Sequence, residues 1–160
     1  MKKDTSDLLL LDVNVLLALA WPNHQFHVAA VRRLEPRRHR WATCALTQLA
    51  FIRLSSNPAV IPHPATPAGA AALLREMVAD TGHVYLESLP SPAADGMEIL
   101  LERALGHQQV TDAYLLALAQ RHHTTFLTFD ARLKHLALAT AHVEILGTNP
   151  NSPIPRTRRN

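Results

Sequence analysis

Two short stretches that each end on an aspartate set the strongest limit on how this chain can fold. Leu8–Leu11 is a run of four leucines that stops at Asp12, and residues 124–129, rich in β-branched and apolar side chains, stop at Asp130. A short apolar run of this kind is typical of a central parallel strand that is covered on both faces. We therefore expect a buried strand over 8–11 and a further strand over 124–129, each with an acid at its carboxyl end.

Helical patterns separate these strands from others along the chain. Thr66 followed by Pro67 predicts a helix N-cap with proline at the first helical position. Gly106 is expected to end one helix as a C-cap, and Thr111 to cap the next. The predicted strands cover 8–11, 40–43, 84–86, 124–129 and 143–146, and the predicted helices cover 13–21, 26–34, 46–54, 67–79, 94–105, 111–119 and 131–136. Strands separated by helices predict a three-layer α/β fold with a mainly parallel central sheet flanked by helices.

The length and composition suit one domain. The chain has 160 residues, 48% of them apolar, which is enough for a single core. We assign residues 1–148 to this domain and expect residues 149–160, rich in proline and arginine, to form a basic mobile tail. No apolar run approaches the roughly 20 residues that span a bilayer. Cys44 is the single cysteine, so an intrachain disulfide is impossible and a reducing cytoplasm is the expected location.

The charge balance gives weak guidance about partners. The formal net charge of +3 favours an anionic partner, because clustered lysine and arginine bind phosphates. Five arginines between residues 32 and 40 carry much of this charge, and cations at a helix end also suit the helix dipole. The charge alone therefore does not decide the function.

Three acids occupy positions from which they could converge. Asp12 and Asp130 follow strands, where ligands collect in open α/β sheets, and Asp112 lies in the first turn of a predicted helix. Carboxylates held together repel one another unless a cation is present, and oxygen ligands suit Mg²⁺ or Mn²⁺. Such an ion could activate a water for attack on phosphorus. Each acid also has a simpler explanation, as a helix cap or as a partner of a helix dipole.

Four local strings together resemble the PIN-domain superfamily, and within it the VapC-type toxins. They are Leu-Leu-Asp-Val-Asn-Val-Leu-Leu at 10–17, Trp-Ala-Thr-Cys at 41–44 running into Leu-Thr-Gln at 46–48 and Phe-Ile-Arg at 51–53, Val-Thr-Asp-Ala-Tyr-Leu-Leu at 110–116, and Thr-Phe-Asp at 128–130. Their order and spacing cover residues 8–146, so the set is specific although each string alone is weak.

The resemblance implies both an activity and its partners. It implies a PIN-like fold and an endoribonuclease that depends on Mg²⁺ or Mn²⁺, hydrolyses RNA through a metal-activated water, and is silenced by a VapB-like antitoxin. It also implies a homodimer formed through apolar helices. By position, Asp12 matches the family's first acid, Asp112 its third and Asp130 its fourth, and Asn14 matches a small polar residue that orients the first carboxylate.

One position departs from the family pattern. The second acid of the family, a glutamate, is matched here by Gln48, whose amide oxygen can face a cation or position a water but brings no charge. Metal affinity should therefore fall. This leaves open an alternative in which the chain is a PIN-like module that binds RNA or a partner without cleaving. Thr43, at the end of a predicted strand, could contact a metal-bound water or substrate, or could cap the following helix.

A phosphatase of the haloacid dehalogenase type is a second enzymatic alternative. In that class the aspartate after an apolar strand is a nucleophile, and another aspartate two residues later is the general acid. Asn14 occupies that second position here, and no well-placed lysine follows. The sequence therefore argues against this class.

Overall fold

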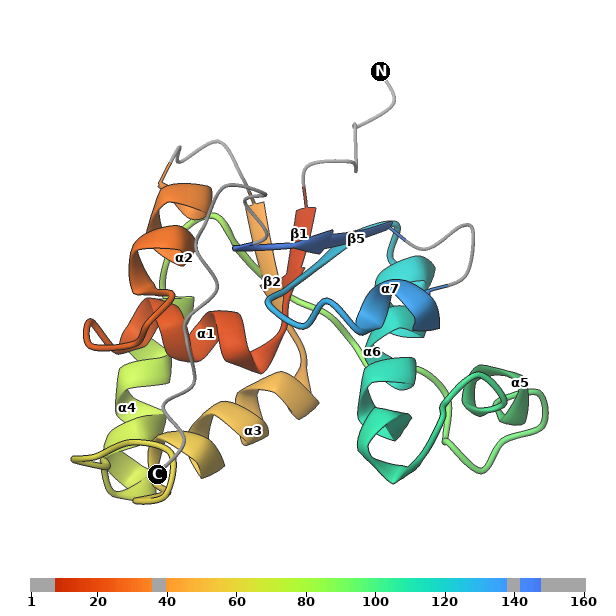
Figure 1. Cartoon of the computed structure of the whole chain (residues 1–160), viewed down its shortest axis with the longest axis horizontal. Coiled ribbons are helices and arrows are strands. Elements are labelled where there is room, and N and C mark those ends of the chain that lie inside the picture. The colour runs from red at the N-terminus through yellow and green to blue at the C-terminus, as the bar shows by residue number, and fades with distance from the viewer. Residues whose placement is uncertain (1–7, 36–39, 138–141, 148–160) are drawn as a thin grey trace, which may run out of the picture.

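The computed structural model describes residues 8–35, 40–137 and 142–147, and its centre is a five-stranded sheet (Figure 1). The strands are β1 (Leu8–Leu11), β2 (Arg40–Thr43), β3 (His83–Tyr85), β4 (Thr125–Thr128) and β5 (His142–Ile145), in the spatial order β3-β2-β1-β4-β5. All four neighbouring pairs are parallel. The predicted mainly parallel sheet is confirmed.

Helices cover both faces of this sheet. One face carries α1 (Val13–Ala20), α2 (His27–Leu34), α3 (Ala45–Ser55) and α4 (Pro67–Val78), and the other carries α5 (Glu98–Leu101), α6 (Val110–Arg121) and α7 (Leu133–Leu136) (Figure 1). Side chains of β1 alternate between two buried clusters: Leu9 and Leu11 pack under α1, and Leu10 packs under α6. The predicted three-layer architecture is therefore confirmed. Leu9, Leu10 and Leu11 are buried because both faces of the sheet are covered, and Leu8 at the start of β1 is partly buried.

The order in which the chain adds strands to the sheet reverses at β1. From β1 it builds β2 and then β3 on one side, and it then returns to place β4 on the other side of β1. In open α/β sheets, ligands bind beyond the carboxyl ends of the strands at such a switch point. The fold thus directs attention to the residues that follow β1 and β4.

The helix predicted over residues 94–105 is wrong in extent, because only Glu98–Leu101 is helical. Gly96 adopts φ 86°, a left-handed conformation that interrupts a right-handed helix before Met97. Gly106 is not a C-cap either. Its backbone is extended (φ 165°, ψ 178°), and it leads into the 3₁₀ helix η2 (His107–Gln109).

Two other boundaries also differ from the prediction. Thr111 does not cap α6, because η2 runs directly into that helix and α6 begins at Val110. The third strand lies one residue earlier than predicted, although Leu86 still donates a 2.8 Å backbone hydrogen bond to the carbonyl of Thr43. The Thr66 cap is confirmed, since its hydroxyl accepts a 3.0 Å hydrogen bond from the backbone of Gly69.

Some sequence-based expectations lie outside the described residues. These are the basic tail over 149–160 and the domain boundary at 148. Within residues 8–35, 40–137 and 142–147, no helix has the length and apolar character needed to cross a membrane.

Candidate active site

Asp12 follows β1 and is held in place by the start of α1. Its backbone N–H donates to the carbonyl of Leu127 at 2.9 Å, and its Oδ1 accepts a 2.7 Å hydrogen bond from the backbone of Val13. Its side chain is almost buried, at 7% exposure. The helix-cap explanation for Asp12 is therefore correct, but it uses only one carboxylate oxygen.

Thr128, the last residue of β4, forms a hydrogen bond with the other carboxylate oxygen of Asp12. Its hydroxyl donates a 2.6 Å hydrogen bond to Asp12 Oδ2. The same oxygen atom of Thr128 accepts hydrogen bonds from Asn14 Nδ2 at 3.2 Å and from the backbone N–H of Asp130 at 3.1 Å. Asn14 thus supports the first carboxylate through Thr128, and a hydrogen bond from its side chain also acts on Asp12 itself. The Thr128 hydroxyl links the ends of β1 and β4.

The surroundings of Asp12 oppose its ionisation. Burial raises the pKa of Asp12, and the negative charge of Asp130 adds to that rise, while hydrogen bonds from Thr128 and Val13 act in the opposite direction. A buried carboxylate with a second carboxylate nearby is an environment that a bound cation would relieve.

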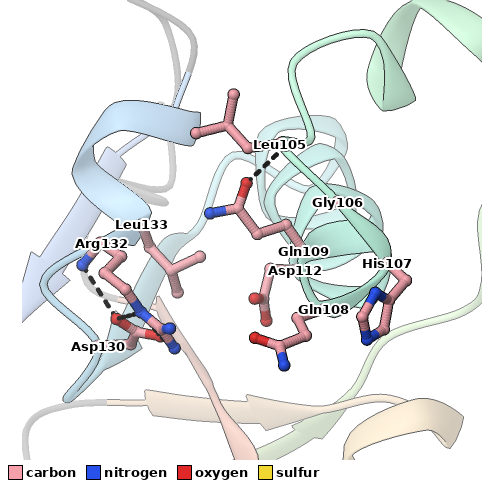
Figure 2. A pocket seen from close by; sticks show the side chains of 9 residues that line it. All are labelled: Leu105, Gly106, His107, Gln108, Gln109, Asp112, Asp130, Arg132 and Leu133. Carbon is pink, nitrogen blue, oxygen red and sulfur yellow. Dashed lines mark hydrogen bonds and ion pairs between the residues drawn. The ribbon is translucent and has the colours of Figure 1, made fainter.

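Asp112 and Asp130 line the same cavity (Figure 2). The cavity has a volume of about 300 Å³ and lies between η2, the start of α6 and the segment that follows β4. Its lining residues are Leu105, Gly106, His107, Gln108, Gln109, Asp112, Asp130, Arg132 and Leu133. The structure therefore brings together two of the predicted acids in an open space, with Asp12 close enough to interact electrostatically with both.

Asp112 is the least satisfied of the three acids. It lies in the first turn of α6, as predicted, and its side chain is half-buried. Its carboxylate accepts no hydrogen bond from the described part of the chain. Burial, followed by the charges of Asp12 and Asp130, raises the pKa of Asp112 to about 6, and Arg132 only partly opposes this rise.

Asp130 is instead paired with Arg132. The Arg132 guanidinium donates from Nε to Oδ1 at 2.9 Å and from Nη2 to Oδ2 at 2.6 Å, and the Arg132 backbone N–H donates to Oδ1 at 3.0 Å. The hydrogen bonds from Arg132 hold the pKa of Asp130 below its ordinary value. Asp130 closes a turn ahead of α7 and does not cap the helix itself.

Gln48 and Thr43 form a separate polar group on the other side of β1. Gln48 Nε2 donates to Thr43 Oγ1 at 2.9 Å, and His83 Nε2 lies 2.8 Å from the same hydroxyl. Burial lowers the pKa of His83. Thr43 does not cap α3, because that position is taken by Cys44, whose backbone N–H donates to the Thr47 hydroxyl. Among the described residues, no hydrogen bond joins Gln48 or Thr43 to any of the three acids.

The donor set is suited to a hard divalent cation. Asp12, Asp112 and Asp130 offer only oxygen atoms, which match Mg²⁺ or Mn²⁺ rather than Zn²⁺. The half-buried Asp112 carboxylate has no hydrogen-bond donor among the described residues, and the charges of Asp12 and Asp130 act on it more strongly than that of Arg132. No three His, Cys, Asp or Glu side chains within the described ranges are already arranged as a metal site. Metal binding would therefore require small side-chain movements, above all at Asp130.

A family model described as "PIN domain" matches residues 9–138, which is most of the chain and includes all three acids. The chain belongs to the PIN-domain family. The expected family assignment is thus confirmed.

Relatives of this PIN-domain chain are VapC ribonucleases. It is 41% identical to Ribonuclease VapC39 of Mycobacterium tuberculosis over 138 residues, which cover 86% of this chain and 98% of the relative. It is also 41% identical to Ribonuclease VapC38 of the same organism over 130 residues, covering 80% and 89%. These similarities support a nuclease of the VapC type.

A solved structure supports the fold alone. The structure titled "Crystal structure of VapBC2 from Rickettsia felis bound to a DNA fragment from their promoter" superposes with a TM-score of 0.57, at 11% sequence identity, over 87% of this chain and 98% of the other. At that identity, the match adds no information about site residues.

Two residues of this PIN domain emerge only from the structure. Thr128 appears in the sequence as an ordinary strand residue, and Arg132 as a charge near a short helix. The spacing Thr128-x-Asp130-x-Arg132 contains both, but nothing local indicates that the Thr128 hydroxyl reaches Asp12, 116 positions earlier in the chain.

Proposed function

We propose that this chain is the toxin ribonuclease of a toxin–antitoxin pair and that it hydrolyses RNA phosphodiester bonds with a divalent cation, Mg²⁺ or Mn²⁺. The observation that carries the proposal is the half-buried carboxylate of Asp112, which accepts no hydrogen bond from the residues that the structure describes, lines one cavity with Asp130 and lies within electrostatic reach of Asp12. The similarity to VapC ribonucleases supplies the reaction class.

Each residue has a distinct part in the proposed site. Asp12 and Asp112 would be the principal ligands and Asp130 a supporting one, with Asn14 and Thr128 fixing the orientation of Asp12. A bound Mg²⁺ or Mn²⁺ would lower the pKa of a coordinated water and stabilise charge on the phosphate oxygens. Gln48 would orient a water, and Thr43 would orient the Gln48 amide through their 2.9 Å hydrogen bond.

The burial of Asp12 supports a role in orientation as well as in binding. A carboxylate fixed at both oxygens cannot turn freely, so it presents its remaining lone pairs in a constant direction. Asp112, by contrast, has no hydrogen-bonding partner in the described ranges and can turn toward an ion. One fixed and one adjustable carboxylate would suit an ion that keeps several of its waters, as Mg²⁺ usually does.

A short antitoxin is the proposed protein partner. An apolar hollow of about 330 Å³ lies between α3, α5 and α6, close to the start of α6 that carries Asp112, and its lining includes Leu46, Met97, Leu101, Val110 and Tyr114. Leu46 and Val110 are 39% and 45% exposed. An apolar antitoxin segment would cover this surface and block entry to the acids. A homodimer remains a prediction, testable by light scattering of the purified chain.

The test of the activity is RNA cleavage by the purified chain in Mg²⁺, Mn²⁺ or EDTA. We expect cleavage with metal only, and a loss of roughly 100-fold or more in Asp12→Asn, because one of the principal ligands is removed. Asp95→Asn, at an exposed loop position, is the matched control and should cleave like the unchanged chain. Cleavage that persists in EDTA or in Asp12→Asn would contradict the proposed mechanism.

The antitoxin is tested separately. Co-purification of a small protein with the tagged chain from its native cell, and loss of RNA cleavage when that protein is added back, are the expected results. Recovery of an active chain without any bound protein, from cells in several growth states, would contradict the proposed partnership.

A further inference from the structure

Arg132 holds the carboxylate of Asp130 with more contacts than the local turn requires. Its guanidinium contacts both carboxylate oxygens, through Nε at 2.9 and 3.1 Å and through Nη2 at 2.6 Å (Figure 2). The turn itself is already closed by the Arg132 backbone N–H, which donates to Asp130 Oδ1 at 3.0 Å. The side chain of Arg132 therefore has a role beyond the local backbone structure.

The Arg132 guanidinium lies beside two carboxylates, and its exposure to solvent allows it to move away from them. Arg132 lines the same cavity as Asp112 and interacts electrostatically with it. Its side chain is 74% exposed, whereas that of Asp130 is 23% exposed. An exposed ion pair of this kind is weak, because water competes for both partners. The pair can thus exchange partners without disturbing the core.

This pairing has a direct consequence for metal binding. An arginine fork occupies lone pairs on both oxygens of Asp130, and its positive charge repels a second cation at the same carboxylate. A divalent ion that uses Asp130 must first displace the guanidinium. The displaced guanidinium, still anchored at residue 132, would then lie at the wall of a cavity of about 300 Å³.

We propose that Arg132 is a built-in counter-cation that competes with the divalent metal for Asp130 and, once displaced, binds an RNA phosphate in the adjoining cavity. Guanidinium recognises carboxylate and phosphate with the same two-pronged geometry, so the exchange replaces one anion by another. The inference rests on the function proposed above. It makes metal and RNA binding cooperative, since each ligand releases a group that the other needs.

The first test measures metal binding without RNA. Calorimetric titration of Mn²⁺ into Arg132→Gln should give a dissociation constant about three- to tenfold lower than for the unchanged chain, because a weak competitor has been removed. Arg132→Lys retains the positive charge but not the two-pronged guanidinium. Its Mn²⁺ dissociation constant should lie between those of Arg132→Gln and the unchanged chain. Lys134→Gln, an exposed cation two residues further on, is the matched control and should not change Mn²⁺ binding.

The second test measures RNA cleavage at saturating Mn²⁺. Arg132→Gln should raise KM about five- to twentyfold and leave kcat within about threefold, because a phosphate contact is lost while the metal ligands remain. Circular dichroism and thermal melting in EDTA establish that each variant is folded. A purely structural role of Arg132 would change melting and leave both the Mn²⁺ affinity and KM unaltered.

The outcomes separate this inference from the proposed function. Mn²⁺ binding that is lost in Asp12→Asn but unchanged or weaker in Arg132→Gln would overturn the competition and leave the metal-dependent nuclease intact. Tighter Mn²⁺ binding in Arg132→Gln with an unchanged KM would overturn the phosphate contact. Absence of Mn²⁺ binding to the unchanged chain would contradict the proposed function itself.

Discussion

The hydroxyl of Thr128 donates a 2.6 Å hydrogen bond to Asp12 Oδ2, and this contact joins the ends of two adjacent parallel strands. Thr128 is completely buried and Asp12 nearly so, which means that water cannot replace the contact if it is lost. Because the same hydroxyl accepts hydrogen bonds from Asn14 and from the backbone of Asp130, the geometry around the proposed metal site depends on one oxygen atom.

Thr128→Val should impair both stability and activity. Valine has nearly the shape of threonine but removes one hydrogen-bond partner from each of three polar groups, so we expect the free energy of unfolding to fall by about 1–2 kcal/mol. Loss of the group that orients Asp12 should lower metal affinity and RNA cleavage by about 10- to 100-fold. Urea unfolding and Mn²⁺ titration provide the measurements. Thr128→Ser, which keeps the hydroxyl, is the control and should retain most of the stability and most of the activity.

Asp112→Asn should stabilise the metal-free protein. The pKa of Asp112 is raised to about 6 in the folded chain, so folding disfavours its ionised form, and stability is lost as the pH rises through that value. The shift of about 2 pKa units corresponds to roughly 3 kcal/mol, but the side chain is half-exposed and solvent screening reduces the expected gain to about 1 kcal/mol.

Thermal melting in EDTA tests whether Asp112→Asn stabilises the metal-free protein. Asp112→Asn should melt about 2–4 °C above the unchanged chain at pH 7.5, and the difference should shrink as the pH falls from 6.5 toward 4. In excess Mn²⁺ the order should reverse, because the metal stabilises the chain that binds it. A melting temperature in EDTA that is lower for Asp112→Asn at pH 7.5 would show that this carboxylate is satisfied in solution.

The sequence predicts the positions of the acids but not the hydrogen bonds and ion pairs that each of them makes. Asp12 directly follows its strand, as predicted, because an apolar run and its end are local features, and Asp112 lies in the first turn of its helix. Asp130 follows β4 at a distance of one residue, since that strand ends at Thr128 and not at Phe129. The Thr128 hydrogen bond depends on the pairing of Leu11 with Leu127, which only the assembled sheet defines. The helix over 94–105 begins late for a local reason, the left-handed conformation of Gly96, which the apolar spacing does not reveal. Likewise, no sequence pattern indicates that Arg132 forms an ion pair with Asp130 or that Thr43 accepts a hydrogen bond from Gln48.

Gln48→Glu should strengthen metal binding if Gln48 faces the ion as its position in the family suggests. The pairing of Leu10 with Ala42, continued by one residue, places Thr43 beside Leu11, so the Gln48 amide on Thr43 lies near the end of β1. A carboxylate there would add one negative charge to the ligand set, and we expect the Mn²⁺ dissociation constant to fall about three- to tenfold. The Thr43 hydroxyl, which now accepts from Gln48, can donate its one proton to the new carboxylate while it accepts from protonated His83 Nε2, so the local hydrogen bond survives the change in that tautomer of His83. Gln25→Glu, at an exposed turn, adds the same charge elsewhere and should leave the constant unchanged. If both variants bind Mn²⁺ like the unchanged chain, Gln48 serves only to hold the Thr43 hydroxyl, which His83 also contacts, and the three aspartates alone define the ion's surroundings.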